Sequence, residues 1–311
     1  MLKKGGRSRL SRYIDILGPW LGIILFAIVM TSLRPVFLTP ANITNVLVDA
    51  AAYIVVAVGM TFVITGAGID LSVGSILALS GIAMTWLIKY TPIDPMLAIV
   101  VCLAVGASLG LVNGLLITKL KMPDIVATLA TAISYRGLAL VIVGGRVLFS
   151  FPPALRYLGV TRLGAIVPVC IIMAILVVVA IGGNRTAAIH AGIPVDRYKI
   201  YTYIFSGLMA ALAGVMIIGR LDSYHATFGA GMEFHTIAAV IIGGTALFGG
   251  AGRLWGSLAG ALLIAMVING LVAFGVNFYW QQIAIGIVLM LAVALYTVTG
   301  LRQLRGVGGG G

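Results

Sequence analysis

The chain has 311 residues, of which 61% are hydrophobic and only 9% are charged, and its formal net charge is +12. A soluble domain of this length carries about 25% charged residues, so the composition excludes a water-exposed globular surface. Apolar runs recur along the whole chain and leave no room for a separate soluble domain, so we predict a single membrane domain.

The positive charge lies in short segments between the apolar runs. That distribution suits membrane topology and contact with anionic lipid headgroups, and it lacks the aromatic-interleaved basic stripe of a nucleic-acid-binding protein. We therefore expect membrane lipids as partners and no nucleic acid. Cys102 and Cys170 both fall inside apolar runs, so we interpret them as packing residues.

The first 13 residues are strongly basic and precede an apolar stretch that begins near Ile14. This stretch is too long for the apolar region of a signal peptide, and no clear small-residue cleavage site follows it, so we interpret it as a retained first span. The predicted organisation is a basic cytoplasmic segment (1–13), a membrane-spanning domain (14–300) and a cytoplasmic tail (301–311).

Ten segments approach the roughly 20 mostly apolar residues that a spanning helix needs. The third and the eighth are rich in Gly and Ser, so either is a candidate for a broken or re-entrant element. The sequence thus predicts an all-α integral membrane protein with about ten transmembrane helices, at 14–34, 43–65, 71–90, 95–118, 124–143, 164–182, 199–219, 234–250, 254–275 and 279–300.

The distribution of Lys and Arg favours cytoplasmic N and C termini, chiefly because of the basic N-terminal segment. Gly68–Ser75 and Gly249–Ser257 each open a small-residue helix, which suggests two inverted halves of five helices. Small residues also recur in any tightly packed membrane bundle, so the repeat stays open.

The motifs of an enzyme are missing from the sequence. It contains no GxxxxGK[ST] phosphate loop, and its three histidines form no metal-binding pattern. We expect no catalytic residue, no metal site and no cofactor bound by this chain.

Ionisable residues inside the predicted spans mark function or pairing, because charges are costly in a bilayer. Most lie near predicted span ends, where snorkelling or capping explains them, and Asp70 either caps the third helix or serves a gate. No row of acidic ligands crosses the membrane, which favours an external energy source over a proton or sodium gradient. The ionisable candidates are Asp49, Asp70, Asp124, Arg136, Glu233 and His235.

Small and polar residues supply the candidates for a pathway or a gate. Glycines crowd the eighth and ninth spans, where they permit close approach and sliding of helices. The amides Asn113, Asn269, Gln281 and Gln282 are equally candidates for helix–helix hydrogen bonds. The predicted pathway or gating residues are Asp70, Ser72, Gly74, Asn113, Gly243, Gly244, Thr245 and Asn269.

The segment from Gly182 to Pro194 is too polar to span a membrane. Its Ala-rich centre favours a short helix that Gly192 ends and Pro194 prevents from continuing. Such a helix between two spans is either an ordinary interfacial loop or a lever on which a partner protein pushes.

Four stretches in order carry a resemblance to a known family. They are GAGIDLSVGS (66–75), YRGLA (135–139) with GGR (144–146), GN (183–184) with AA (187–188) and GI (192–193), and IAAVIIGGTALFGG (237–250). The chain resembles the permease subunits of bacterial ABC importers for simple sugars such as ribose, xylose, arabinose and galactose, and more distantly the branched-chain amino acid permeases. The stretch at 189–190, Asp124 and the stretch at 252–255 depart from the usual pattern of this family.

The resemblance implies a half-transporter in the bacterial cytoplasmic (inner) membrane. A second permease subunit, identical or paralogous, would complete the pathway, a separate ATPase would hold ATP and Mg²⁺, and a periplasmic or lipid-anchored binding protein would deliver the solute. The segment 183–197 would couple to the ATPase. The resemblance assigns this contact to Asn184, Ala187, Ala188, Gly192 and Ile193.

Three hypotheses follow for the function. The first is the membrane subunit of an ATP-driven sugar importer, and the alternative is a stand-alone secondary transporter or channel for a small polar solute. The third is a non-transporting membrane scaffold or enzyme, which the Gly-rich helices with scattered polar residues disfavour. A pentose, a hexose, a sugar-like signalling molecule and a nucleoside all remain open as the solute, and the stretch 68–75 disfavours branched-chain amino acids.

Overall fold

The computed structural model describes residues 9–153, 155, 162–163, 167–168 and 195–308. Six of the described helices, α2, α3, α4, α5, α9 and α11, are long and apolar enough to cross a membrane. The prediction of an all-helical integral membrane protein is therefore confirmed. The helices are α1 (Arg9–Leu33), η1 (Pro35–Leu38), α2 (Pro40–Thr65), α3 (Val73–Tyr90), α4 (Pro95–Thr118), α5 (Asp124–Val143), α9 (Val195–Leu221), α10 (Met232–Ile242), α11 (Leu254–Ala273) and α12 (Phe278–Gly308).

Four two-residue strands accompany these helices. β1 (Leu148–Phe149) pairs antiparallel with β4 (Ser223–Tyr224), and β2 (Arg162–Leu163) pairs with β3 (Val167–Pro168). The first pair ties the connection after α5 to the C-terminal end of α9.

Local sequence explains where several helices begin. Thr39 precedes Pro40, and its side chain accepts a hydrogen bond from the main-chain N–H of Asn42. Asp94 precedes Pro95 in the same way and accepts from the first two free N–H groups of α4. A capping oxygen satisfies N–H groups that have no partner inside the helix, and proline at the first position lacks the N–H altogether.

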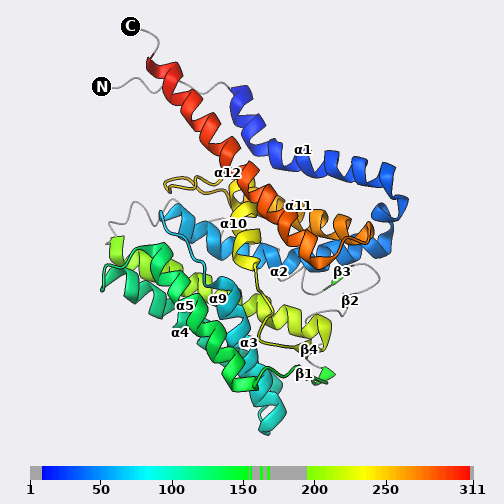
Figure 1. Cartoon of the computed structure of the whole chain (residues 1–311), viewed down its shortest axis with the longest axis vertical. Coiled ribbons are helices and arrows are strands. Elements are labelled where there is room, and N and C mark those ends of the chain that lie inside the picture. Colours follow the sequence, from blue (N-terminus) through cyan, green and yellow to red (C-terminus); the bar gives the residue numbers. More distant parts are fainter. Residues whose placement is uncertain (1–8, 154, 156–161, 164–166, 169–194, 309–311) are drawn as a thin grey trace.

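Helix α2 lies in the middle of the molecule (Figure 1). It contacts α9 on one side and α10 and α11 on the other, and most of its side chains from Ala50 to Ile64 are buried. Helices α3, α4 and α5 lie beyond α9, and α1 lies beyond α11 (Figure 1). Because α9 packs against α4, the two predicted five-helix halves interleave in space.

Glycine brings α4 and α9 unusually close together. A Cβ added at Gly110 would lie 2.1 Å from the carbonyl oxygen of Tyr203, and one added at Gly207 would lie 2.2 Å from the carbonyl oxygen of Gly106. Only glycine leaves room for backbones at this separation, so these two helices behave as one packed pair.

The predicted eighth segment, 234–250, is not one full span but a broken element, which is the alternative that its Gly content indicated. Helix α10 ends at Ile242, and a loop with a left-handed backbone at Gly244, Gly249 and Gly250 follows it. These glycines adopt positive φ values at little cost, whereas a continuing helix would require negative ones. The apolar composition is that of a span, but the glycines divide it into a short helix and a loop.

A re-entrant segment, residues 225–231, leads into α10. Its upstream neighbour Tyr224 packs its ring against Gly81, in the middle of α3, and donates a hydrogen bond to the carbonyl of Leu77, about one turn nearer to the start of that helix. Further along, Gly229 lies against Gly74, in the first turn of α3. The segment therefore descends along α3, and α10 begins inside the bundle.

Two sequence predictions fall mainly on residues outside the described part. Of the predicted sixth span, 164–182, the structure describes only Val167–Pro168, which form strand β3 where the prediction had helix. Of the predicted coupling segment, 183–197, it describes residues 195–197, which form the first turn of α9. The five proposed coupling residues lie outside the described residues.

Candidate functional site

A pocket of about 500 Å³ opens between α3, α5 and the start of α10. Its volume falls within the roughly 300–1,000 Å³ typical of small-molecule sites. Its wall is mostly apolar but contains one cation, one carboxylate and one hydroxyl. Its lining residues include Ser75, Ile133, Arg136, Gly137, Glu233 and Phe234. We call this space the α3–α5–α10 pocket.

Arg136 holds the re-entrant segment beside this pocket. Its Nη1 donates hydrogen bonds to the main-chain carbonyl oxygens of Ala226 and Phe228, the latter at 2.7 Å. These carbonyls belong to irregular backbone inside the bundle, where each unpaired polar group costs several kcal/mol. Arg136 is therefore a structural partner of the segment as well as part of the pocket wall.

Gly74 lets Glu233 and the re-entrant segment approach α3. A Cβ at this position would lie 2.1 Å from the carbonyl oxygen of Gly229 and 2.5 Å from Oε2 of Glu233. The sequence singled out Gly74 as a pathway or gating residue, and the structure places it where α3 meets the first residues of α10.

Three other predicted residues come together in a buried hydrogen-bonded cluster around the start of α3, next to Leu71 of the pocket wall. Oδ1 of Asp70 accepts from the main-chain N–H of Ser72 at 2.9 Å and from its hydroxyl at 2.6 Å. Nδ2 of Asn113 donates to the same hydroxyl at 2.7 Å, and the hydroxyl of Ser206 donates to Oδ2 of Asp70 at 2.8 Å. All four side chains are buried. We call them the Asp70 cluster; it joins the start of α3 to α4 and α9.

A second polar group lies one helix turn nearer to the start of α9. Nζ of Lys199 lies 2.9 and 2.8 Å from the two carboxylate oxygens of Asp124. The hydroxyl of Tyr203 donates to Asp124 and lies within hydrogen-bonding distance of the carbonyl of Ile69. Asp124, which departs from the usual pattern of the family, thus connects the start of α5 to the start of α9.

The remaining predicted residues lie elsewhere. Thr245, in the loop after α10, is buried and accepts a hydrogen bond from the main-chain N–H of Arg253. Gly243 packs against the backbone of Gly256, whose carbonyl carbon would lie 2.3 Å from a Cβ added at Gly243. Asn269 exchanges two hydrogen bonds with Asn42, which makes it a helix–helix partner between α11 and α2. Gly244 belongs to the same loop as Thr245.

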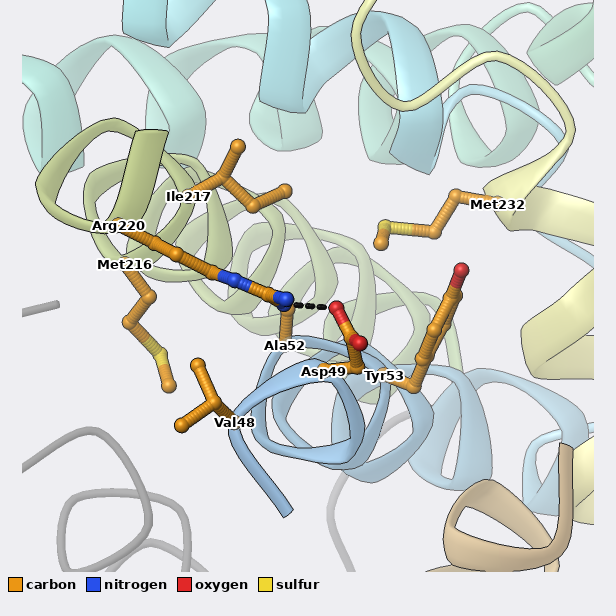
Figure 2. Close-up of a pocket in the computed structure, with 8 residues that line it drawn as sticks. All are labelled: Val48, Asp49, Ala52, Tyr53, Met216, Ile217, Arg220 and Met232. Carbon is orange, nitrogen blue, oxygen red and sulfur yellow. Dashed lines mark hydrogen bonds and ion pairs between the residues drawn. The ribbon is translucent and has the colours of Figure 1, made fainter. Parts of the chain in front are cut away.

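An ion pair on the other side of α9 closes a small cavity. Figure 2 shows Arg220 reaching from α9 toward Asp49 of α2, with Tyr53 and Met232 beside them. The cavity measures about 80 Å³.

We expect Arg220→Ala to destabilise the protein more than the double variant Arg220→Met with Asp49→Asn. The single change leaves a carboxylate without its cation, whereas the double change removes both charges. Because both side chains are partly exposed, the expected difference is only about 1–2 kcal/mol. Thermal unfolding in detergent measures it, and a double variant no more stable than the single one would contradict the pairing.

Asp70, Asp124 and Glu233 lie at helix starts, as predicted for most of the intramembrane charges, whereas Arg136 lies in the middle of α5. Arg136 binds main-chain carbonyls 90 residues away in sequence, and Asp49 pairs with a cation on α9. Sequence spacing does not reveal these partners. The sequence marks these residues as candidates only because charges are rare within apolar runs. Within the described residues, no three His, Cys, Asp or Glu side chains gather to hold a metal.

Comparison with known proteins places the chain in a family. The family model described as the branched-chain amino acid transport system permease component matches residues 42–293. The ribose import permease of Bacillus subtilis is 42% identical over 296 residues, covering 90% of this chain and 92% of the relative. The ribose import permease of Escherichia coli K12 is 38% identical, covering 87% and 90%.

A third relative has a different sugar in its name. The D-allose transport system permease of Escherichia coli K12 is 35% identical over 298 residues, covering 90% of this chain and 91% of the relative. No solved structure matches the chain. With its apolar spanning helices, the chain is a multi-pass membrane protein, and it belongs to this family of transport permeases together with the ribose and allose permeases.

Proposed function

We propose that this chain is the membrane-spanning subunit of an ATP-driven importer for a simple sugar in the bacterial cytoplasmic membrane. The observation that carries the proposal is its similarity to ribose import permeases over about nine-tenths of both chains. The α3–α5–α10 pocket supports it, because intramembrane charges that line a cavity mark solute pathways. Such a subunit catalyses no reaction itself.

The partners follow from the same proposal. A second permease subunit, identical or paralogous, completes the pathway, and a periplasmic or lipid-anchored binding protein delivers the solute. ATP and Mg²⁺ bind to a separate ATPase subunit, which is supported by the lack of a phosphate loop in this sequence.

The proposed topology has ten spans, two inverted halves and both termini in the cytoplasm. Its support is that, among the described residues, the loops and helix ends meet in two groups at opposite ends of the bundle. The turn after α2 meets the loop after α10, where the N–H of Gly250 donates to the carbonyl of Thr65. On the opposite end, Arg34 lies over the ring of Phe274. Ten spans with internal termini place the first group inside and the second outside.

Coupling to the ATPase is assigned to residues 183–197, with Asn184, Ala187, Ala188, Gly192 and Ile193 at the contact. The structural support is indirect. The segment runs directly into α9, whose first three turns carry Lys199 and Tyr203, the partners of Asp124. A push on this segment would reach Asp124 and then Ser206 of the Asp70 cluster along one rigid helix, so a gating role for Asp70, Ser72, Gly74 and Asn113 belongs to the same proposal.

Replacing Gly192 or Ala188 with a bulky residue is expected to leave the permease folded and in the membrane but to reduce sugar uptake to background while the ATPase still turns over. A large side chain would disturb the contact through which ATP closure moves the helices. Uptake and ATP hydrolysis are measured together in proteoliposomes. Normal uptake in both variants would count heavily against the assignment.

The test of the proposed function is purification from native membranes in mild detergent, followed by reconstitution with the co-purifying proteins. We expect an ATPase subunit and a solute-binding protein to accompany the chain, and D-ribose uptake to require both and ATP. Uptake by the chain alone that collapses with an uncoupler and ignores ATP would instead establish a secondary transporter.

A further inference from the structure

We propose that the α3–α5–α10 pocket is a contact site for a neutral polyol in transit, with Glu233 and Phe234 as the groups that touch the solute. The inference rests on the proposed function and extends it to particular residues. It commits to a monosaccharide-like occupant, because the pocket wall combines a carboxylate, a hydroxyl and an exposed aromatic ring.

The position of the pocket indicates that it opens to water. Arg136 lies in the middle of α5, and Glu233 lies at the start of a helix that begins inside the bundle. Charged side chains at membrane depth face a bundle interior or a water-filled cavity, because facing lipid is too costly. The mouth of the pocket is nevertheless open at Ile133, which is 69% exposed, and at Phe234, which is 47% exposed. A water-filled passage beside this mouth accounts for both observations.

The chemistry of the wall suits hydroxyl groups. A carboxylate such as that of Glu233 accepts two hydrogen bonds, and charge-assisted hydrogen bonds are about twice as strong as neutral ones. The Ser75 hydroxyl adds a group that both donates and accepts. The ring of Phe234 offers an apolar face against which the C–H face of a sugar ring can pack. Because the wall is mostly apolar and has only a few polar groups, it can bind a sugar weakly and release it again, as a transport pathway requires.

The first experiment measures water access. Gly137 lines the pocket, and a Cβ there meets no atom within 4 Å, so Gly137→Cys fits. Leu138, its neighbour on α5, is 49% exposed but does not line the pocket, so Leu138→Cys is the matched control. Both are made without Cys102 and Cys170, in the complete importer in proteoliposomes, after D-ribose uptake by the cysteine-free parent has been verified.

A membrane-impermeant thiol reagent is expected to label position 137 at least ~10-fold faster than position 138, in keeping with a wet cavity beside a lipid-facing surface. Labelling at 137 is expected to stop D-ribose uptake, and D-ribose with its binding protein and ATP is expected to slow the labelling. Equal rates at the two positions would overturn the inference, whether lipid or the second permease subunit fills the pocket.

The second experiment replaces the carboxylate. Glu233→Gln keeps the shape of the side chain and is expected to reduce D-ribose uptake at least ~10-fold, as for the loss of one hydrogen bond to a charged group. Asp94→Asn makes the same change at an exposed helix cap and is expected to keep wild-type uptake. The amount of assembled importer is compared in every case. Wild-type uptake by Glu233→Gln would overturn the inference.

Different results would contradict the proposed function and the assignment of the pocket. If the unmodified importer does not take up D-ribose or any other simple sugar with ATP, the proposed function fails. If it does, while Gly137→Cys labels like its control and Glu233→Gln transports like the wild type, only the pocket assignment fails. Strong inhibition of uptake by leucine would also overturn the pocket assignment, because it places an amino acid where a polyol is proposed.

Discussion

Asp70→Ala is expected to cost about 3–5 kcal/mol of stability or to prevent accumulation of the protein in the membrane. Asp70 is fully buried and accepts three hydrogen bonds, two from Ser72 and one from Ser206. Removing the carboxyl leaves buried donors without a partner, and each costs about 1–3 kcal/mol. The midpoint of thermal unfolding, followed by size-exclusion chromatography of detergent-solubilised protein, measures the effect.

Two comparisons sharpen this result. Asp70→Asn keeps an oxygen for Ser72 and lets the Ser206 hydroxyl rotate to accept from the new amide, so its loss should be smaller. Asp94→Ala removes a carboxylate that caps α4 from an exposed position, and its expected cost is about 1 kcal/mol. If Asp70→Ala unfolds at the same temperature as Asp94→Ala, the Asp70 cluster contributes far less than its geometry indicates.

Gly110→Val is expected to prevent α4 and α9 from packing, with a cost above about 3 kcal/mol. The added Cβ would lie 2.1 Å from a main-chain oxygen at Tyr203, and a main-chain atom cannot move aside as a flexible side chain can. Because this helix pair carries Asn113 and Ser206 of the Asp70 cluster, we also expect transport to be lost. The yield of monodisperse protein and its unfolding midpoint check the prediction.

The matched control is a helical glycine with free space. A Cβ at Gly137 or at Gly286 meets no atom within 4 Å, so alanine at either position should keep the wild-type unfolding midpoint or raise it slightly. Equal losses in Gly110→Val and in these alanine variants would show that general helix perturbation, and not close approach, controls the outcome.

The best-predicted elements are those whose ends carry a local signal. Helices α4 and α5 begin and end where the sequence predicts, at 95–118 and 124–143. Proline follows Asp94 at one start and precedes Asp124 at the other, so the caps are readable without any tertiary information. The eighth segment stayed open because hydropathy is the same for a whole helix and for a short helix followed by a glycine loop, and only its Gly content indicated the break.

The polar contacts were only half predictable. Asp70, Ser72 and Asn113 stand out in an apolar sequence, and the structure brings them together. Ser206 did not stand out, because a single serine is common in membrane helices and its partner lies 136 residues earlier. Such contacts depend on which helices become neighbours, and a hydropathy profile does not contain that information.

The shortness of α10 has a consequence for biosynthesis. Its 11 residues make a helix about 16 Å long, roughly half of the 30 Å hydrocarbon core. A helix of that length cannot stop in the bilayer by itself when it leaves the ribosome. Its main packing partners are α2, which precedes it in the chain, and α11 and α12, which follow it. Because two of these partners are synthesised after α10, insertion of residues 225–253 becomes a late folding step against protein, not a partitioning step against lipid.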